Sequence, residues 1–479
     1  MKKFYLFIFV ALIGAVSCVK ECVQTNISNG SLDDLGYIST VRSLSDALTD
    51  LDQTLDLIYS GTRSNERKRY SINNVHTFIA SQSTRSNSVV DIPDTLAYIV
   101  NFDDDGYAIL GAQSDVSPIY SITESGVFDV EKFENAIHYE VANNIITKEE
   151  YEKRLAEELA HMDEEEFYST DEDFAYGLTA SSLVADIVSS PVIIDPTPVT
   201  PPDPEPDYPR VIDTDTIRYV EFLDYYPQMM TTKWHQDSPF NNKCKDDDGE
   251  ICPAGCVVIA LAQIMAYHEY PKNTKFNGIV VDWDVVKMYN NQYMYLNESP
   301  IAKQLSNLCY GLGNSDNCDV NYTPSGSSAK TRRAKLTLKN YGYKDVDRRY
   351  GFNDKDQQKA IEMISQNKPL YIDGSRTGGA HAWVLDGYLK RRVVTEVTIH
   401  YSNRPTEVEV YYGSTQQLVH CNFGWGGTHD GYYVLRNSFN TEERYIDIDD
   451  INIEYNIEDP NTTQHRHYQT NFDIITYDL

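Results

Sequence analysis

Three residues that together could carry nucleophilic catalysis occur in the order Cys, His, Asn in the second half of the chain. Cys256 precedes His381 by 125 residues and Asn422 by 166 residues. A thiol can attack a carbonyl carbon, an imidazole can take up and return the proton, and a carboxamide can accept the imidazole N–H and fix the ring. Each of these residues alone is more often structural. Together, in this order, they indicate thiol-based acyl transfer.

Cys256 opens an apolar segment that is predicted to form a buried helix. From Val257 onward, apolar residues recur at i, i+3, i+4, i+7 and i+8, and the segment is bracketed by Pro253 and Pro271. The thiol would lie beside free backbone N–H groups in the first helical turn, where the helix dipole favours a thiolate. We therefore expect a reactive sulfur at the tip of this helix.

The other two residues lie on predicted strands. His381 opens an apolar strand after a pair of glycines, and Asn422 ends a later strand that is followed by aromatic residues and glycines up to Gly427. Those aromatic side chains would keep water off a hydrogen bond between the two. Gln236, twenty residues before Cys256, could donate a side-chain N–H to an oxyanion.

Around these residues the chain resembles the streptopain family of secreted bacterial cysteine proteases, a branch of the papain-like fold. The resemblance covers most of the chain between Tyr219 and Leu435 and rests on three motifs in the family's order. They are Gly255-Cys256-Val257 with Ala262-Gln263-Ile264-Met265, then Gly379-x-His381-Ala382-x-Val384-x-Asp386-Gly387-Tyr388, then His420-x-Asn422-x-Gly424-Trp425-Gly426-Gly427.

The resemblance implies a role for each matching residue and no cofactor. Cys256 would be the nucleophile, His381 the general base and acid, Asn422 the residue that orients His381, and Gln236 the oxyanion donor. Ser327, Ala380 and Trp425 would line the substrate cleft, although a plain turn is the alternative for Ser327. No zinc site is expected, because the cysteine spacing lacks a paired C-x-x-C pattern.

Two departures from the family stand out. Phe423 follows Asn422 where relatives usually have Trp, so an indole N–H is missing there. Strand signals near 382–388, 393–399 and 407–412 predict separate strands, and the last two lie in a strand-rich insertion between Leu389 and Gln417. We expect this insertion to form a surface hairpin that could shape substrate access.

The chain is expected to contain more than one domain of the α+β class. Residues 18–190 carry helix signals near 44–58 and from Thr147 onward, and strand signals near 96–102 and 106–110. Eight prolines between Pro191 and Pro209 predict an extended, exposed spacer. Residues 210–479 are predicted to form a papain-like domain, a helical half followed by an antiparallel sheet.

The N-terminus predicts export. Lys2 and Lys3 precede an apolar run that ends in small residues before Cys18, which indicates a signal peptide over residues 1–17 and resembles a bacterial lipobox with Cys18 as the lipid-bearing residue. Ordinary signal cleavage is the alternative. The net charge of −31 argues against nucleic acids and anionic membranes as partners, so a membrane contact is expected only through the lipid.

Members of the family are made as zymogens, so residues 18–190 are expected to act as an inhibitory propeptide that folds against the cleft and is cut off between about Ser181 and Arg210. The expected partners are protein or peptide substrates and this propeptide.

Two other functions stay open. A transglutaminase-like acyltransferase would usually complete the site with Asp, and an adhesion or binding protein would carry a vestigial cleft. Two close cysteine pairs, Cys244/Cys252 and Cys309/Cys318, could form disulfides.

Overall fold

The structure is a computed structural model of the whole chain. It describes residues 42–60, 71–79, 95–103, 105–113, 116–133, 136–137, 146–147, 173–189, 211–289, 299–350, 352, 354–376, 379–402, 404–434, 464–465 and 471–479. The expected signal peptide, Cys18 and the proline-rich spacer lie outside these residues. So does the helix expected from Thr147 onward, except Thr147 itself, which is in a short strand and not in a helix. Within them, no helix has both the length and the apolar character needed to cross a membrane.

The chain is α+β, as predicted. Helices and strands alternate along it, and most strands join one sheet. The helices with described bounds are α2 (Leu44–Ser60), α5 (Asp173–Ser189), α6 (Cys256–His268), α7 (Trp283–Lys287), α8 (Pro300–Gly313), α9 (Thr331–Asn340) and α10 (Asp354–Ser365). The strands of the main sheet are β1 (Ile72–Ile79), β2 (Thr95–Phe102), β3 (Tyr107–Gly111), β4 (Ile119–Thr123), β6 (Val211–Tyr226), β11 (Lys344–Tyr350), β12 (Leu370–Arg376), β13 (Gly379–Tyr401), β14 (Glu407–Tyr412), β15 (Gln416–Asn422), β16 (Gly431–Val434) and β18 (Asn471–Asp478). Short pairs are formed by β5 (Ile146–Thr147) with β17 (Gln464–His465), β7 (Lys275–Phe276) with β8 (Ile279–Val280), and β9 (Asn321–Thr323) with β10 (Gly326–Ser328).

The main sheet has 12 strands and runs without a break from the N-terminal region into the C-terminal half. Its order is β1-β2-β3-β4-β16-β15-β13-β12-β18-β11, and β6 and β14 both pair with β13. The two halves meet where β4 pairs antiparallel with β16, with Tyr432 opposite Ile122. A methyl group at Gly431 would lie 2.1 Å from the Ile122 carbonyl oxygen, so this close approach requires glycine.

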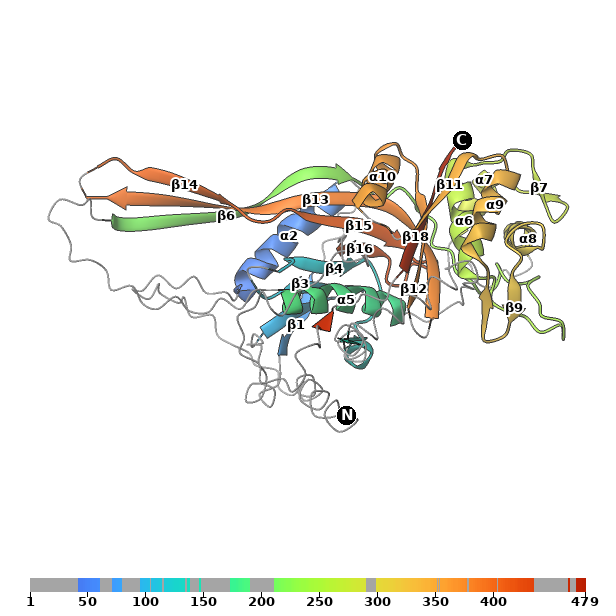
Figure 1. Cartoon of the computed structure of the whole chain (residues 1–479), viewed down its shortest axis with the longest axis horizontal. Coiled ribbons are helices and arrows are strands. Elements are labelled where there is room, and N and C mark those ends of the chain that lie inside the picture. Colours follow the sequence, from blue (N-terminus) through green and yellow to red (C-terminus); the bar gives the residue numbers. More distant parts are fainter. Residues whose placement is uncertain are drawn as a thin grey trace.

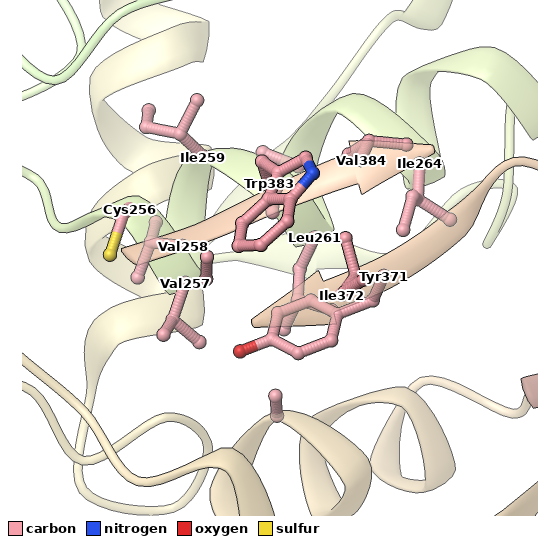
Figure 2. Packing of buried hydrophobic residues seen from close by; sticks show 14 of the residues in the cluster. Cys256, Val257, Val258, Ile259, Leu261, Ile264, Tyr371, Ile372, Trp383 and Val384 are labelled. Atoms are coloured by element: carbon pink, nitrogen blue, oxygen red, sulfur yellow. The ribbon is translucent and has the colours of Figure 1, made fainter. Parts of the chain in front are cut away.

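Helix α6 begins at Cys256, as the sequence predicts, and packs against the sheet. Its residues from Cys256 to Ala266 are all buried, and Figure 2 shows its apolar side chains beside Tyr371 and Ile372 of β12 and Trp383 and Val384 of β13. The helix ends at His268, whose Nε2 lies 2.9 Å from the Tyr477 hydroxyl. This contact joins the end of the helix to β18.

The insertion forms part of a long three-stranded arm. The sequence predicts separate strands near 382–388 and 393–399, but the structure joins them into the 23-residue strand β13. The outer half of β13 pairs with β14 on one side and with β6 on the other. Figure 1 shows this arm extending away from the rest of the molecule. The predicted hairpin is therefore present, with β6 as a third strand that the sequence did not indicate.

A buried cluster of charges ties the N-terminal region to the base of the arm. Asp50 of α2 forms ion pairs with Arg42, with Arg218 of β6 at 3.1 Å and with Arg391 of β13 at 3.8 Å. The Asp50 and Arg391 side chains are fully buried. One carboxylate therefore serves three guanidinium groups at this contact.

The six cysteines among the described residues are free thiols in this structure. The pairs Cys244/Cys252 and Cys309/Cys318, which the sequence offered as possible disulfides, are not bonded.

Candidate active site

Cys256 occupies the first position of α6 and is almost completely buried. Gly255 before it adopts φ 95°, a left-handed conformation that favours glycine and turns the chain into the helix. Burial raises the pKa of the Cys256 thiol to about 11, despite backbone N–H groups of Ala382 and Val257 that act to lower it. The expected preference for a thiolate at the helix tip therefore does not hold in this state, because desolvation outweighs the favourable N–H groups.

His381 lies on β13 with its ring fully buried. Its Nε2 is 2.8 Å from the Phe423 carbonyl oxygen. Because a carbonyl can only accept, Nε2 carries the hydrogen. Nδ1 is buried and has no hydrogen-bond partner among the described residues. Burial lowers the pKa of His381 to about 4, so the ring is neutral at pH 7 and its Nδ1 lone pair is free to take a proton.

The thiol and the imidazole are neighbours through the backbone of β13. The N–H group that acts on the Cys256 sulfur belongs to Ala382, the residue after His381. Within the described residues, no hydrogen bond joins the sulfur to the His381 ring. The structure therefore brings the two predicted residues to one place and leaves the direct proton-transfer contact unmade.

Aromatic rings enclose His381. Trp425 stacks on it with ring centroids 4.5 Å apart, and Trp383 lies parallel at 6.2 Å. The Phe174 ring, from α5 of the N-terminal region, lies 5.7 Å from the imidazole. Aromatic rings therefore surround His381, and one of them comes from the N-terminal region.

Asn422 reaches the site but does not bond to His381 in this structure. Its Oδ1 accepts a hydrogen bond from Gln263 Nε2 at 2.8 Å and one from the backbone N–H of Gly424 at 3.2 Å. Its Nδ2 donates to the Thr232 carbonyl oxygen at 3.0 Å. The expected direct contact between Asn422 and the imidazole is not formed, because these partners use the amide.

Gln236 lies next to the loop that precedes the nucleophile. Its backbone carbonyl accepts from the Ala254 N–H at 2.8 Å, two residues before Cys256. Its side-chain oxygen is buried without a hydrogen-bond partner among the described residues. This position is compatible with the predicted role of its amide as an oxyanion donor.

The predicted cleft residues have different surroundings. Ser327 is buried, and its hydroxyl donates to the Pro253 carbonyl oxygen at 2.6 Å, so it braces the loop before Cys256. Ala380 is buried in β13 beside His381, and Trp425 is half-buried against the His381 ring. Trp425 and Ala380 are thus close to the imidazole, whereas the Ser327 hydroxyl is engaged elsewhere.

Sequence reasoning missed the polar side chains that surround these residues. Gln263 is fully buried in α6, and its Oε1 accepts from the Thr232 hydroxyl at 2.9 Å. Asp430 accepts from the Phe423 N–H at 2.8 Å. The available signal was that Gln263 is the only strongly polar residue between Cys256 and Ala266, in a helix that is otherwise apolar.

Three ionisable side chains link the two halves near this site. His420 Nδ1 lies 2.6 Å from Asp386, and its Nε2 lies 3.5 Å from Glu124 of the N-terminal region. The Asp386 and Glu124 carboxylates raise the pKa of His420 to about 10, against the effect of burial. Hydrogen bonding and charge from His420 and Lys233 lower the pKa of Glu124 to about 2, again against burial.

Comparisons with known proteins find a matching family and curated relatives. Residues 234–433 match the Peptidase C10 family. Streptopain from Streptococcus pyogenes serotype M28 (strain MGAS6180) is 28% identical over 242 residues, which cover 42% of this chain and 53% of streptopain; streptopain from serotype M1 gives the same figures. The chain thus spans about half the length of the curated relatives it matches.

Solved structures give weaker similarities. A mutant prointerpain A fragment from Prevotella intermedia has a TM-score of 0.41 and 14% identity, and covers 79% of this chain and 94% of its own. Active wild-type interpain A from the same organism has a TM-score of 0.33 and 20% identity, with coverages of 52% and 94%. By sequence, residues 234–433 are thus similar to the Peptidase C10 family, and the chain is similar to the streptopains over 242 residues.

Proposed function

We propose that the chain is an exported cysteine endopeptidase that is made as a zymogen. The observation that carries this proposal is the placement of the Cys256 thiol against the backbone beside His381, whose Nδ1 is free and whose Nε2 is held by a carbonyl. An imidazole in that tautomer can accept the thiol proton. The match of residues 234–433 to the Peptidase C10 family supports the same chemistry.

The proposed reaction is a two-step acyl transfer. His381 Nδ1 takes the proton of Cys256, and the sulfur attacks the peptide carbonyl carbon. Gln236 and the backbone N–H of Cys256 stabilise the oxyanion. His381 then gives its proton to the leaving amine and later activates the water that splits the thioester. Substrate would lie along Ala380 and Trp425, with Ser327 supporting the loop beneath.

The N-terminal region would keep the enzyme inactive. Phe174 covers the imidazole, and burial keeps the thiol protonated and the ring neutral. Removal of this region would admit water to the pair, lower the pKa of the thiol and raise that of the imidazole. Cutting between about Ser181 and Arg210, by the enzyme itself or by another protease, would then start activity.

Incubation of purified full-length protein tests this proposal. Peptide-terminus sequencing would follow cutting of the spacer and of an added unstructured protein. We expect wild type to cut both, Cys256→Ala and His381→Ala to cut neither, and the matched control Cys309→Ala to behave as wild type. Peptidase activity that survives Cys256→Ala would refute the assignment. Amine incorporation that exceeds hydrolysis would instead indicate a transglutaminase-like acyltransferase.

A thiol-directed peptidase inhibitor tests the zymogen. It should label Cys256 only after the N-terminal region has been removed. Equal labelling of the intact chain would show that the region does not protect the thiol.

Export and lipid attachment at Cys18 form a separate part of the proposal, supported by the sequence of residues 1–18. Mass spectrometry of the mature N-terminus would test it. A diacylglyceryl group on Cys18 is expected, and an unmodified terminus produced by ordinary cleavage would refute lipidation.

A further inference from the structure

The His381 ring is oriented by a main-chain group. Its Nε2 donates to the carbonyl of Phe423, the residue that follows Asn422. A backbone carbonyl has no rotamers of its own, so its direction depends on what holds the surrounding turn. The question is therefore which side chains fix the Phe423 peptide.

Two side chains hold the turn on either side of Phe423. The Asn422 Oδ1 accepts from the Gly424 N–H, two residues on, which closes an Asx turn across Phe423. Asp430 accepts from the N–H of Phe423 itself. Gly424 adopts φ 71°, and a methyl group there would lie 2.9 Å from Ile259 of α6, so the turn rests directly on that helix.

Gln263 holds Asn422 from the same helix. Its Nε2 donates to Asn422 Oδ1, and its Oε1 accepts from the Thr232 hydroxyl and, at 3.4 Å, from the Trp234 N–H. The amide is fully buried, where an unmet hydrogen bond is costly. Gln263 lies seven residues after Cys256, two helical turns away. One rigid helix thus carries both the nucleophile and the support of the turn.

We propose that Gln263 is a positioning residue for His381. It fixes Asn422, Asn422 closes the turn, and the turn presents the Phe423 carbonyl that holds the imidazole in its Nε2–H tautomer with Nδ1 free. Asn422 then acts on the imidazole through the backbone and not by direct contact. As far as it concerns catalysis, this inference rests on the proposed function, but the tautomer can be measured without any peptidase activity.

The first experiment measures that tautomer by ¹⁵N NMR of ring-labelled histidine in the full-length protein at pH 7, with His381→Ala used to assign the signal. Wild type should show one protonated nitrogen, Nε2. Gln263→Met, which has a similar volume but no amide, should give averaged shifts from a mixture of tautomers. Gln263→Glu keeps the acceptor for Thr232 but loses the donor to Asn422, and it should show the same averaging. It provides the test if the Met variant fails to fold.

The control is Asn307→Ala. Asn307 is a buried amide in α8 that bonds to the Lys303 carbonyl oxygen, so its loss should reduce stability and leave the His381 tautomer unchanged. An Nε2–H tautomer that persists in both Gln263 variants would overturn the proposal, whether or not the protein is a peptidase.

The second experiment measures kcat and KM of the activated enzyme. Gln263→Glu should lower kcat by about tenfold to a hundredfold, a size usual for side chains that orient a functional group from behind, with little change in KM. Combined with Asn422→Ala, it should add little to the loss from Asn422→Ala alone. If the losses in kcat from the two substitutions multiplied instead, Asn422 would act without Gln263. That result would refute the proposed chain of contacts.

Discussion

The two ends of β13 form an instructive contrast within a single strand. From Ala380 to Leu389 its side chains are buried, and they carry His381 and Trp383. From Thr395 to Tyr401 they are half exposed, and the strand is held by its pairing with β6 and β14. Backbone hydrogen bonds to neighbouring strands are thus enough to hold the outer end of β13. The inner end, which carries His381, is in addition packed on both faces.

The length of the strand also separates the two ends in space. Tyr401 follows His381 by twenty positions, which corresponds to roughly 65 Å at about 3.3 Å per residue. The tip of the arm therefore does not border the Cys256 thiol. This distance gives no support to the expectation that the insertion shapes access to the cleft.

The largest expected effect comes from Trp383→Ala at the packed end. Trp383 is 2% exposed and contacts the rings of His381, Phe423 and Phe472, so its truncation leaves a large cavity. We expect the free energy of unfolding, measured with urea, to fall by about 3–5 kcal/mol. Val397→Ala in the arm should cost less than about 1 kcal/mol. Equal losses of stability in the two variants would show that the two ends of β13 do not differ in how they are held.

At the base of the arm, Asp50→Asn should come next. It leaves Arg42, Arg218 and Arg391 without their shared carboxylate in a buried site, which should cost roughly 3 kcal/mol. The matched arm variant is Asp215→Asn, whose side chain is 71% exposed and pairs only with His400 among the described residues. It should change stability by less than about 0.5 kcal/mol. A neutral result for Asp50→Asn would mean that the cluster contributes nothing to docking of α2.

Glu124→Gln should have a smaller and pH-dependent effect, of about 1–2 kcal/mol near pH 6. The lowered pKa of Glu124 contributes stability that is present above its ordinary value of 4.5 and is lost as the pH falls through about 2. The raised pKa of His420 contributes stability that is present below 6.5 and is lost as the pH rises through about 10. The difference between wild type and variant should therefore vanish at both extremes.

Urea titrations at pH 2, 6 and 10 would measure this difference. Glu407→Gln, in an exposed arm pair with Arg404, provides the control and should show almost no effect at pH 6. A difference for Glu124→Gln that stays constant with pH would contradict the assigned ion pair.

Shortening of the arm should have the smallest effect. In one variant Asn-Gly, which favours a two-residue hairpin turn, replaces residues 397–409 and joins Glu396 to Val410, its partner in the present register. Stability should stay within about 1 kcal/mol of wild type, because the described residues among those removed are at most half-buried. A loss as large as that of Trp383→Ala would show that the outer arm is packed against another part of the chain.

The sequence predicted elements that have strong local signals. Helix α6 and strand β14 were expected at the observed positions, because one is continuously apolar and the other alternates between Glu and Val before two tyrosines. Strand β18, near the C-terminus, was not expected. It lies between β12 and β11, whose sequences are more than ninety residues earlier, and nothing local specifies that pairing.

The site was predictable in its residue types but not in its contacts. Motif order identified Cys256, His381 and Asn422, whereas the hydrogen bond between Gln263 and Asn422 joins residues 159 apart and appears only after folding. The acidity of Cys256 was misjudged for the same reason. A helix terminus, which favours the thiolate, can be predicted from a local pattern. The burial that disfavours the thiolate depends on the whole fold.

The junction between β4 and β16 has a consequence for any protein made without its N-terminal half. β16 has four residues, and its pairing with β4 requires the bare backbone of Gly431. Without β4, the backbone groups of β16 that pair with it would become an open edge, the kind of surface on which identical chains associate. A truncated peptidase segment should thus be prone to aggregate on storage. Its solubility would depend on how quickly that edge is covered.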